Sequence, residues 1–229
     1  MGVHKSLPFF KARDFLFLGV WRIIKIMSAN KRKIVIFVMG RPGSGKDTQA
    51  DFLAKRFNLL KIVTSDLLQE KFKKSPTEPT VQKEKEIFEK GVLNTPSWVV
   101  SAVKEKISEL TAGGLEGRDG IIFAGSPRTL YEAENLVPFL ENVFGTDNLK
   151  AVYLETTAEE AIKRISLRAA RALDRDPEKL KVRMTEYEER TMPVLDYFNQ
   201  RNILIKVDGM PAQEIVFEDI LLKLEGLEK

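Results

Sequence analysis

The sequence predicts an α/β fold in which helices flank a five-stranded parallel sheet. Short apolar runs of strand length alternate along the chain with segments of helix length, the order that parallel strands with helical crossovers require. The first run is continuously apolar and rich in β-branched residues, as in strands that are buried on both faces. The 229 residues are 43% hydrophobic and 31% charged, a balance that indicates a globular chain rather than a disordered or membrane-spanning one.

The individual elements follow from this alternation. Five apolar runs are assigned as strands, at residues 33–39, 60–63, 120–124, 151–154 and 203–207. The segments between them are long enough for helices, and a further helix closes the chain. The predicted helices are residues 47–57, 96–110, 130–142, 158–170, 177–199 and 212–224.

The segment between the second and third predicted strands is longer than one crossover helix needs. It contains about fifty residues, and a stretch with two prolines at residues 75–79 breaks it into short pieces. We therefore expect one domain over residues 33–229 that carries a small helical insertion at about residues 64–95. Insertions beside the carboxyl ends of parallel strands usually shape ligand sites.

The composition excludes several kinds of chemistry. The chain contains no cysteine, which rules out disulfides, thiolate zinc sites and a cysteine nucleophile, and which fits a reducing compartment. Its one histidine, His4, precedes the predicted domain, so neither histidine acid–base catalysis nor a histidine metal cluster is expected. Lysine, arginine, carboxylates and backbone amides remain as the groups that carry function.

The net charge of +4 is concentrated near the N-terminus. Residues 1–33 carry eight basic residues and one acidic residue, so this segment contributes +7 and the rest of the chain −3. The predicted domain is therefore slightly acidic, and no nucleic-acid-binding surface is expected.

The N-terminal arm, residues 1–32, contains an apolar run at residues 15–21. This run is far shorter than the roughly 20 residues that a membrane-spanning helix needs, so no transmembrane segment is expected. Three interpretations of the arm remain open: a basic amphipathic surface anchor, a targeting segment, or translated upstream sequence ahead of a start at Met27.

A glycine-rich loop follows the first predicted strand and opens the first predicted helix. Its sequence at residues 40–48 has the spacing of a phosphate-binding loop in the expected strand–loop–helix context. The glycines let backbone N–H groups converge on an anion at the helix N-terminus, and Lys46 reaches the terminal phosphates of a nucleoside triphosphate. The predicted ATP-phosphate ligands are Gly40, Pro42, Gly43, Ser44, Gly45, Lys46, Asp47 and Thr48.

With this loop and the motifs after it, the chain resembles the adenylate kinase and nucleoside monophosphate kinase family. Residues 40–49 match the family loop GxPGxGKGTQ except at Asp47. Further similar segments are residues 64–68 (family TGDLLR), 91–93 (GxLV), 125–129 (DGFPRT), Arg164, Arg168, Arg183, residues 191–193 and residues 207–209. The resemblance extends from about residue 33 to the C-terminus.

The resemblance implies a P-loop NTPase-type fold and a phosphotransferase of nucleotide biosynthesis. The expected reaction moves the γ-phosphoryl group of MgATP to a nucleoside monophosphate, with AMP as the first expectation. Mg²⁺ is the implied cofactor, and the implied setting is a cytoplasmic monomer without a nucleic-acid partner. No catalytic base is needed because the acceptor phosphate is already anionic, so the protein mainly positions and neutralises phosphate oxygens.

Arginines are the candidates for that work because they are permanently charged and bind phosphate in a bidentate manner. Arg164, Arg168 and Arg171 recur at i, i+4 and i+7, on one face of a predicted helix. The lid, at about residues 168–176, is short, and its arginine is either Arg171 or Arg175, of which Arg175 is preferred. The catalytic residues that the resemblance implies are Lys46, Arg128, Arg164, Arg168, Arg175 and Arg183.

The implied acceptor site departs from the family pattern at several positions. Its residues are Thr64, Gln69, Leu93, Gly125, Arg128 and Glu132. Gln69 replaces an arginine on the acceptor phosphate, and Ser126 replaces an aromatic residue nearby. Glu132 replaces a glutamine that reads the base, and a carboxylate, which only accepts hydrogen bonds, suits guanine. Thr64 is the family's choice for adenine, so the sequence leaves the base preference open between AMP and a GMP-like acceptor.

Two further departures concern the metal. Ala124 replaces an aspartate that helps to hold the water shell of Mg²⁺, whereas Asp47 adds a carboxylate to the phosphate loop. We hypothesise that Asp47 compensates and holds Mg²⁺ through water, because a carboxylate beside polyphosphate needs a cation between them. The losses at Gln69 and Ala124 also leave open a nucleotide-binding sensor with little or no turnover, and a kinase for a non-nucleotide small molecule is a third alternative.

Overall fold

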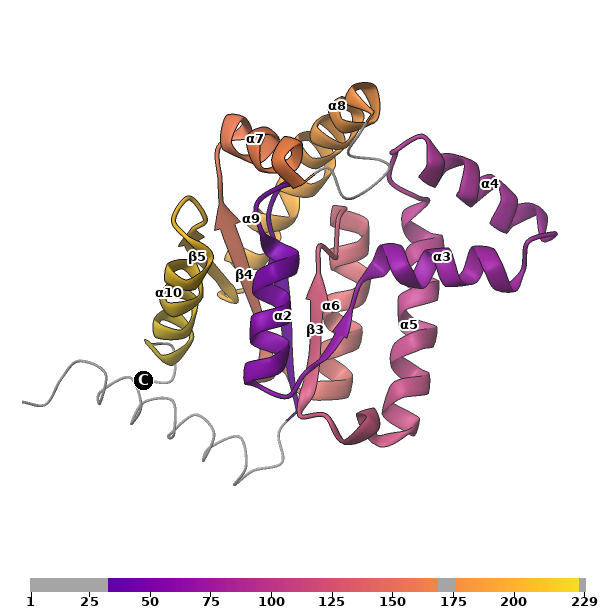
Figure 1. Cartoon of the computed structure of the whole chain (residues 1–229). Coiled ribbons are helices and arrows are strands. Elements are labelled where there is room, and N and C mark those ends of the chain that lie inside the picture. Colours follow the sequence, from indigo (N-terminus) through magenta and orange to yellow (C-terminus); the bar gives the residue numbers. More distant parts are fainter. Residues whose placement is uncertain (1–32, 169–175, 227–229) are drawn as a thin grey trace, which may run out of the picture.

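The computed structural model describes residues 33–168 and 176–226, and its centre is a five-stranded parallel sheet (Figure 1). The strands lie in the order β2-β3-β1-β4-β5. Their bounds are Ile34–Met39 (β1), Leu60–Ile62 (β2), Gly120–Ala124 (β3), Leu149–Glu155 (β4) and Leu204–Asp208 (β5). The predicted fold class and all five predicted strands are confirmed, and β4 begins two residues earlier than expected.

The sheet is covered by helices on both faces, which explains the continuous apolar character of its central strand. Val35, Phe37 and Met39 of β1 belong to one hydrophobic cluster, together with residues of α5, α6 and α9. Ile36 and Val38 belong to a second cluster, together with residues of α2 and α10. Since successive strand residues point to opposite faces, a strand buried on both sides has no polar position.

Most of the helices around the sheet, including α7 at the carboxyl end of the strands, lie close to their predicted positions (Figure 1). Their bounds are Lys46–Arg56 (α2), Pro96–Ala112 (α5), Leu130–Phe144 (α6), Ala158–Arg168 (α7), Met192–Gln200 (α9) and Gln213–Gly226 (α10). A left-handed turn, Gly114–Gly117, precedes β3, and a short 3-10 helix, Thr146–Asn148, precedes β4. Phe37 and Phe123 stack with ring centroids 5.3 Å apart, and Phe198 of α9 stacks on Phe37 at 5.2 Å, so aromatic packing joins the sheet to α9.

Two helices occupy the long segment between β2 and α5. They are α3, Thr64–Lys74, and α4, Pro79–Glu89, and Figure 1 shows both projecting beyond the edge of the sheet. The aromatic ring of Phe72 stacks on Trp98 of α5 at 5.8 Å and meets Phe88 of α4 edge-on at 5.6 Å. This aromatic cluster holds α3 and α4 against α5.

The helix expected at residues 177–199 is confirmed as one continuous helical segment, but a π turn that was not expected interrupts its α-helical hydrogen bonding. Helix α8, Pro177–Glu186, is followed by a π-helical segment, Tyr187–Thr191, and then by α9. Pro193 lies just after the π turn, and because it has no N–H group it cannot continue the α-helical hydrogen-bond pattern at that point. The wider π turn ahead of Pro193 lets the chain continue without the clash that an interior proline makes.

Two regions discussed above lie outside the described residues. These are the arm, residues 1–32, and residues 169–175, which include most of the expected lid. Among the helices of the described ranges, none has both the length and the apolar character of a membrane span.

Candidate functional site

The phosphate loop, residues 40–45, joins the carboxyl end of β1 to α2. The N–H group of Ser44 donates to the carbonyl oxygen of Arg41 at 3.1 Å, which closes the loop on itself. Gly43 has φ +86°, and a Cβ atom at this position would lie 2.3 Å from the carbonyl oxygen of Ala161 in α7. Only glycine permits this close approach, so α7 fixes the shape of the loop.

Lys46, the first residue of α2, lies beneath the loop and is nearly buried, with 9% of its surface exposed. Its ammonium nitrogen is 3.9 Å from a carboxylate oxygen of Asp47. Gly125, at φ +71°, lies between Lys46 and Arg128. A Cβ atom at Gly125 would be 2.8 Å from Cε of Lys46 and 3.4 Å from Nη2 of Arg128. Because Gly125 has no side chain, Lys46 at the phosphate loop and Arg128 after β3 can approach each other.

A cavity of about 670 Å³ opens in front of these cations, a size that suits a small ligand. One side is the phosphate loop with the start of α2. The opposite side, here called the acceptor wall, consists of residues 63–69 and 88–94, and α8 closes a third side. Of the residues that the sequence predicts for function, the cavity brings together Gly40, Pro42, Lys46, Asp47, Thr64, Gln69, Leu93, Gly125, Arg128, Glu132 and Arg183.

Cations from three separate elements line this cavity. Besides Lys46, they are Arg128, which follows β3, and Lys179 and Arg183 of α8. The Nε–H group of Arg128 donates to the carbonyl oxygen of Gly125 at 2.6 Å, which holds the base of its side chain. Such a concentration of permanent positive charge suits a polyanionic ligand such as the phosphates of two nucleotides.

The residues that follow Arg128 form a capped helix start. Thr129 is the N-cap of α6, where its Oγ1 accepts from the N–H group of Glu132 at 3.2 Å. The carboxyl group of Glu132 reaches back, so that Oε2 accepts from the N–H group of Arg128 at 2.9 Å and Oε1 lies 3.1 Å from Oγ1 of Thr129. This reciprocal arrangement resembles a capping box, except that the carboxyl group of Glu132 accepts from the N–H group of Arg128, the residue before the N-cap, and not from that of the N-cap itself. Glu132 thus fixes the chain that carries Arg128.

Glu132 is only 2% exposed, although it lines the cavity. Burial raises the pKa of its carboxyl group above the ordinary value, against the opposing effects of the Arg128 N–H group and the Arg128 and Arg190 charges. The sequence predicts that this carboxylate reads the acceptor base. In the structure both of its oxygen atoms already have partners in the chain, so base reading stays a prediction.

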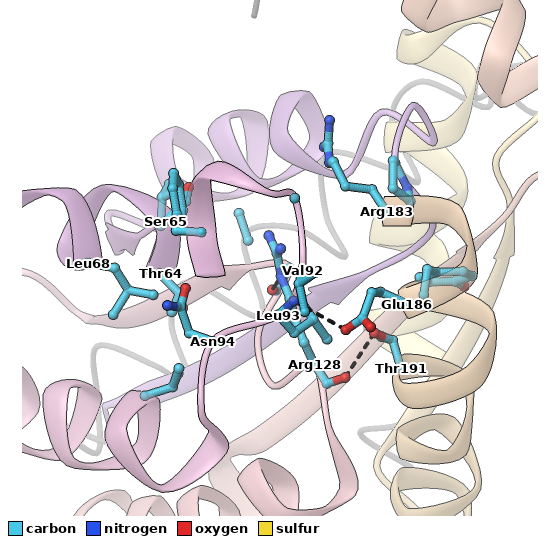
Figure 2. A pocket seen from close by; sticks show the side chains of 18 of the residues that line it. Thr64, Ser65, Leu68, Val92, Leu93, Asn94, Arg128, Arg183, Glu186 and Thr191 are labelled. Atoms are coloured by element: carbon cyan, nitrogen blue, oxygen red, sulfur yellow. Dashed lines mark hydrogen bonds between the residues drawn. The ribbon is translucent and has the colours of Figure 1, made fainter. Parts of the chain in front are cut away.

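Glu186, which the sequence analysis did not single out, ties the acceptor wall to the end of α8. Figure 2 shows the bond, in which the N–H group of Leu93 donates to Oε2 of Glu186 at 3.2 Å. Arg190 also donates to this oxygen, at 3.0 Å. A second drawn bond links the hydroxyl group of Thr191 to the carbonyl oxygen of Arg128 at 2.9 Å. No local pattern reveals such contacts, since Glu186 and Leu93 are 93 residues apart.

Polar atoms on the acceptor wall have few partners within the chain. Thr64 is 6% exposed, and its Oγ1 is buried without a hydrogen-bond partner in the structure. Gln69 donates through Nε2 to the carbonyl oxygen of Ser65 at 3.3 Å, within its own helix. Such a buried hydroxyl group needs a bond from water or from a ligand, and because Thr64 lines the cavity, a ligand there can supply it.

Other predicted residues do not reach the cavity. Gly43, Ser44, Gly45 and Thr48 belong to the loop and the start of α2 but are not among the lining residues. Arg164 points elsewhere, donating to Glu160 at 2.9 Å and, at 2.8 Å each, to the carbonyl oxygens of Gly209 and Met210. The predictions for the side chain of Arg168 and for Arg171 and Arg175 fall outside what the structure describes.

The described residues contain no cluster of three or more Asp, Glu, His or Cys side chains that would hold a metal ion by themselves. Asp47 lines the cavity beside Lys46, and Ala124 lines the same cavity. One carboxylate beside a phosphate cradle fits a Mg²⁺ ion that takes most of its ligands from water and phosphate.

Comparison with known proteins gives a consistent match. The sequence matches the adenylate kinase family over residues 38–203. It is 32% identical to an adenylate kinase of Chlamydia pneumoniae over 212 residues, which cover 82% of this chain and 95% of the relative. Adenylate kinases of Flavobacterium johnsoniae and Thermus thermophilus are also 32% identical, over 85% and 81% of this chain and 100% and 94% of their own lengths.

Proposed function

Because the chain belongs to the adenylate kinase family, and is therefore a phosphotransferase of the nucleoside monophosphate kinase class, we propose that it transfers the γ-phosphoryl group of MgATP to AMP. In this reaction an oxygen of the AMP phosphate attacks the γ-phosphorus as the bond to the β-phosphate breaks. The products are two molecules of ADP. No side chain has to remove a proton, since the attacking oxygen is already anionic.

The observation that carries this proposal is the meeting of Lys46 and Arg128 across Gly125. Lys46 belongs to the phosphate loop side and Arg128 to the acceptor side of one cavity. In the proposed complex, the loop amides and Lys46 hold the ATP phosphates, whereas Arg128 and Arg183 hold the acceptor phosphate and the transferring group. Fixed charges at these places stabilise the transition state without reorganisation.

Two more arginines are proposed to join them. Arg168 and Arg175 retain the role that the family resemblance implies, on the transferring group and in the lid. Arg164 is less suited to it, because its guanidinium group already bonds to Glu160 and to two backbone carbonyls. We therefore propose that Arg164 supports the Gly209–Met210 turn rather than the phosphates.

Mg²⁺ is proposed as the cofactor, and it would neutralise charge on the ATP phosphates when bound. Asp47 is the proposed residue for its water shell, in place of the carboxylate absent at Ala124. Supporting this, Asp47 lines the cavity next to Lys46. Substitution Asp47→Gly tests the role, with Asp51→Gly, an exposed position of the same helix, as control. We expect Asp47→Gly to raise the Mg²⁺ concentration at half-maximal turnover several-fold, and an unchanged value would contradict the assignment.

AMP is proposed as the acceptor for two reasons. The named relatives are adenylate kinases, and each oxygen of Glu132 already accepts a hydrogen bond within the chain, which weakens the argument for guanine. The buried hydroxyl group of Thr64 remains as a partner for the base.

A turnover panel tests the function directly. ADP formation from MgATP is measured with AMP, GMP, CMP and UMP, and ATP binding is titrated separately. We expect turnover that depends on AMP and exceeds the other acceptors by at least about tenfold, a factor that corresponds to roughly 1.4 kcal/mol. A preference for GMP would overturn the choice of acceptor. Tight ATP binding with no turnover for any acceptor would instead support a nucleotide sensor.

A further inference from the structure

A buried pair of polar side chains joins the acceptor wall, through Asn94, to Glu84 of α4, which does not line the cavity, and this pair has no place in the reaction described so far. Glu84 of α4 is 2% exposed and Asn94 is 5% exposed. The amide nitrogen of Asn94 donates to the backbone carbonyl oxygen of Glu84 at 2.6 Å and to its carboxyl Oε2 at 2.8 Å. The same Oε2 accepts from the N–H group of Thr95 at 3.0 Å.

These bonds determine the orientation of the Asn94 amide group. A backbone carbonyl oxygen only accepts hydrogen bonds, so the atom of Asn94 that faces it must be the NH₂ group. Both hydrogens of that group are then used by Glu84. The remaining polar atom, Oδ1, is an acceptor that no bond to another described residue occupies, and Asn94 lines the cavity.

The place of Asn94 in the cavity indicates which part of a ligand it meets. In Figure 2, Asn94 lies on the side where Thr64 and Leu68 are drawn, away from Arg183. Leu68, drawn on the same side in Figure 2, and Val99 give the cavity apolar side chains, whereas Arg183 lies on the other side. Apolar side chains with a few polar atoms suit a nucleoside, and the arginines suit its phosphate.

We propose that Asn94, held by Glu84, is a specificity-determining residue whose Oδ1 accepts a hydrogen bond from the nucleoside part of the acceptor nucleotide. The inference rests on the proposed function, because it takes the ligand of the acceptor wall to be a nucleoside monophosphate. The chemistry that Oδ1 recognises is a hydrogen-bond donor, which the nucleoside offers as a ribose hydroxyl or as an exocyclic amino group. Glu84 acts as a positioning residue, since it touches Asn94 and not the cavity.

Analogues that each lack one donor distinguish these sources. Binding to the full chain is measured by isothermal titration calorimetry for AMP, 2′-deoxy-AMP, 3′-deoxy-AMP and purine riboside monophosphate, which lacks the amino group. We expect AMP to bind about fivefold more tightly than one of the three analogues, the typical effect of one neutral hydrogen bond. In Asn94→Val this preference should disappear for that analogue, while any preferences over the other two remain.

Matched variants separate recognition from folding. Glu84→Gln keeps an oxygen that accepts from the N–H group of Thr95, so AMP affinity should stay within about twofold. Asn135→Val removes an amide that donates to a backbone carbonyl oxygen outside the cavity, and it should leave all four affinities unchanged. If Asn94→Val alone is unstable because Glu84 loses a partner, the double substitution Glu84→Leu with Asn94→Val removes both polar groups and should show the same loss of preference.

The inference is overturned if every analogue preference of the unsubstituted chain survives in Asn94→Val or in the double variant, or if that chain shows no preference at all. Its failure is distinct from failure of the proposed reaction. A chain that binds AMP with the expected preferences but forms no ADP would contradict the phosphotransferase role alone. A chain that binds none of the monophosphates would contradict the acceptor site and this inference together.

Discussion

The phosphate loop and the acceptor wall face each other across one cavity, but different interactions hold them in shape. The loop depends on backbone conformation, since Gly43 has a positive φ and packs directly against the carbonyl oxygen of Ala161. The acceptor wall depends on carboxyl side chains that come from elsewhere. Glu84 holds its end at residues 94–95, and Glu186 holds the N–H group of Leu93.

This difference predicts how each region responds to substitution. A loop made by backbone geometry tolerates no added atoms, so changes there should affect stability and phosphate binding together. A wall held by side-chain hydrogen bonds can lose one bond and persist, so changes there should affect the acceptor and leave ATP binding intact. Four experiments test this contrast, taken in order of decreasing effect.

The largest effect is expected at Lys46. Lys46→Met removes the cation next to the phosphate loop, and turnover should fall by about a thousandfold or more, as for other lost charge-stabilising groups. The fold should remain, because methionine retains the aliphatic stem that packs near Gly125. Lys55→Met, an exposed position of the same helix, is the control and should retain full turnover. Turnover is measured by coupled ADP formation, and a loss under tenfold would remove Lys46 from the proposed mechanism.

Gly43→Ala tests the backbone dependence of the loop. An added Cβ would lie 2.3 Å from the carbonyl oxygen of Ala161, at a positive φ that costs other residues about 1–2 kcal/mol. With the clash included, the free energy of unfolding should fall by about 2–4 kcal/mol in urea titrations. Gly117→Ala has a similar φ of +75° with no atom near the added Cβ, and it should lose only the conformational part. Equal losses at the two positions would show that packing against α7 does not shape the loop.

Glu186→Ala tests the attachment of the acceptor wall. The N–H group of Leu93 loses its acceptor, and the KM for AMP should rise about fivefold because the wall is less well positioned. The KM for ATP should stay within about twofold. Glu189→Ala, an exposed glutamate in the following π-helical segment, serves as control. A parallel rise in both KM values would contradict the separation of the two regions.

The smallest effect is a pH dependence at Glu132, which belongs to neither region but lines the same cavity. Burial raises the pKa of this carboxyl group in the folded chain above the value of 4.5 that it has when exposed. Between these two values the folded chain holds a proton that the unfolded chain has released, so the free energy of unfolding falls as pH rises through this range.

Glu132→Gln should remove that component and flatten the dependence of stability on pH above about 4.5. Glu134→Gln, exposed on the same helix, is the control and should leave the profile unchanged. Thermal unfolding followed by circular dichroism from pH 4 to pH 8 measures both. A profile that is the same in Glu132→Gln and in the unsubstituted chain would show that this carboxyl group keeps its ordinary titration.

Much of the fold was predictable because it depends on local patterns. The continuously apolar run of β1 predicts a central strand, because a strand that is buried on both faces has no polar position. The helical segment at residues 177–199 was also predictable, but the π turn inside it, Tyr187–Thr191, was not. Apolar periodicity is similar in a regular α-helix and in one that contains a π turn.

The candidate site shows the same limit more sharply. Thr129 and Glu132 have the spacing of a capping box, so this role of Glu132 could have been predicted from the sequence. The family resemblance instead led to the prediction that Glu132 reads the acceptor base. The hydrogen-bond partners of Arg164 could not be predicted from the sequence, because Gly209 and Met210 are 45 and 46 residues away. Arg164 therefore binds to backbone carbonyl oxygens, whereas Arg128 and Arg183, from other elements, line the cavity.

The sequence by itself determined the succession of strands and helices along the chain, the phosphate loop and the family. These features lie in contiguous residues whose backbone preferences act over a few positions. The tertiary structure alone decided which carboxyl groups support the acceptor wall, and that Glu132 and Asn94 are buried at the cavity with bonds on both carboxyl oxygens of Glu132 and on the amide nitrogen of Asn94. Such contacts form between segments brought together by folding, and their strength depends on burial, which no local pattern encodes.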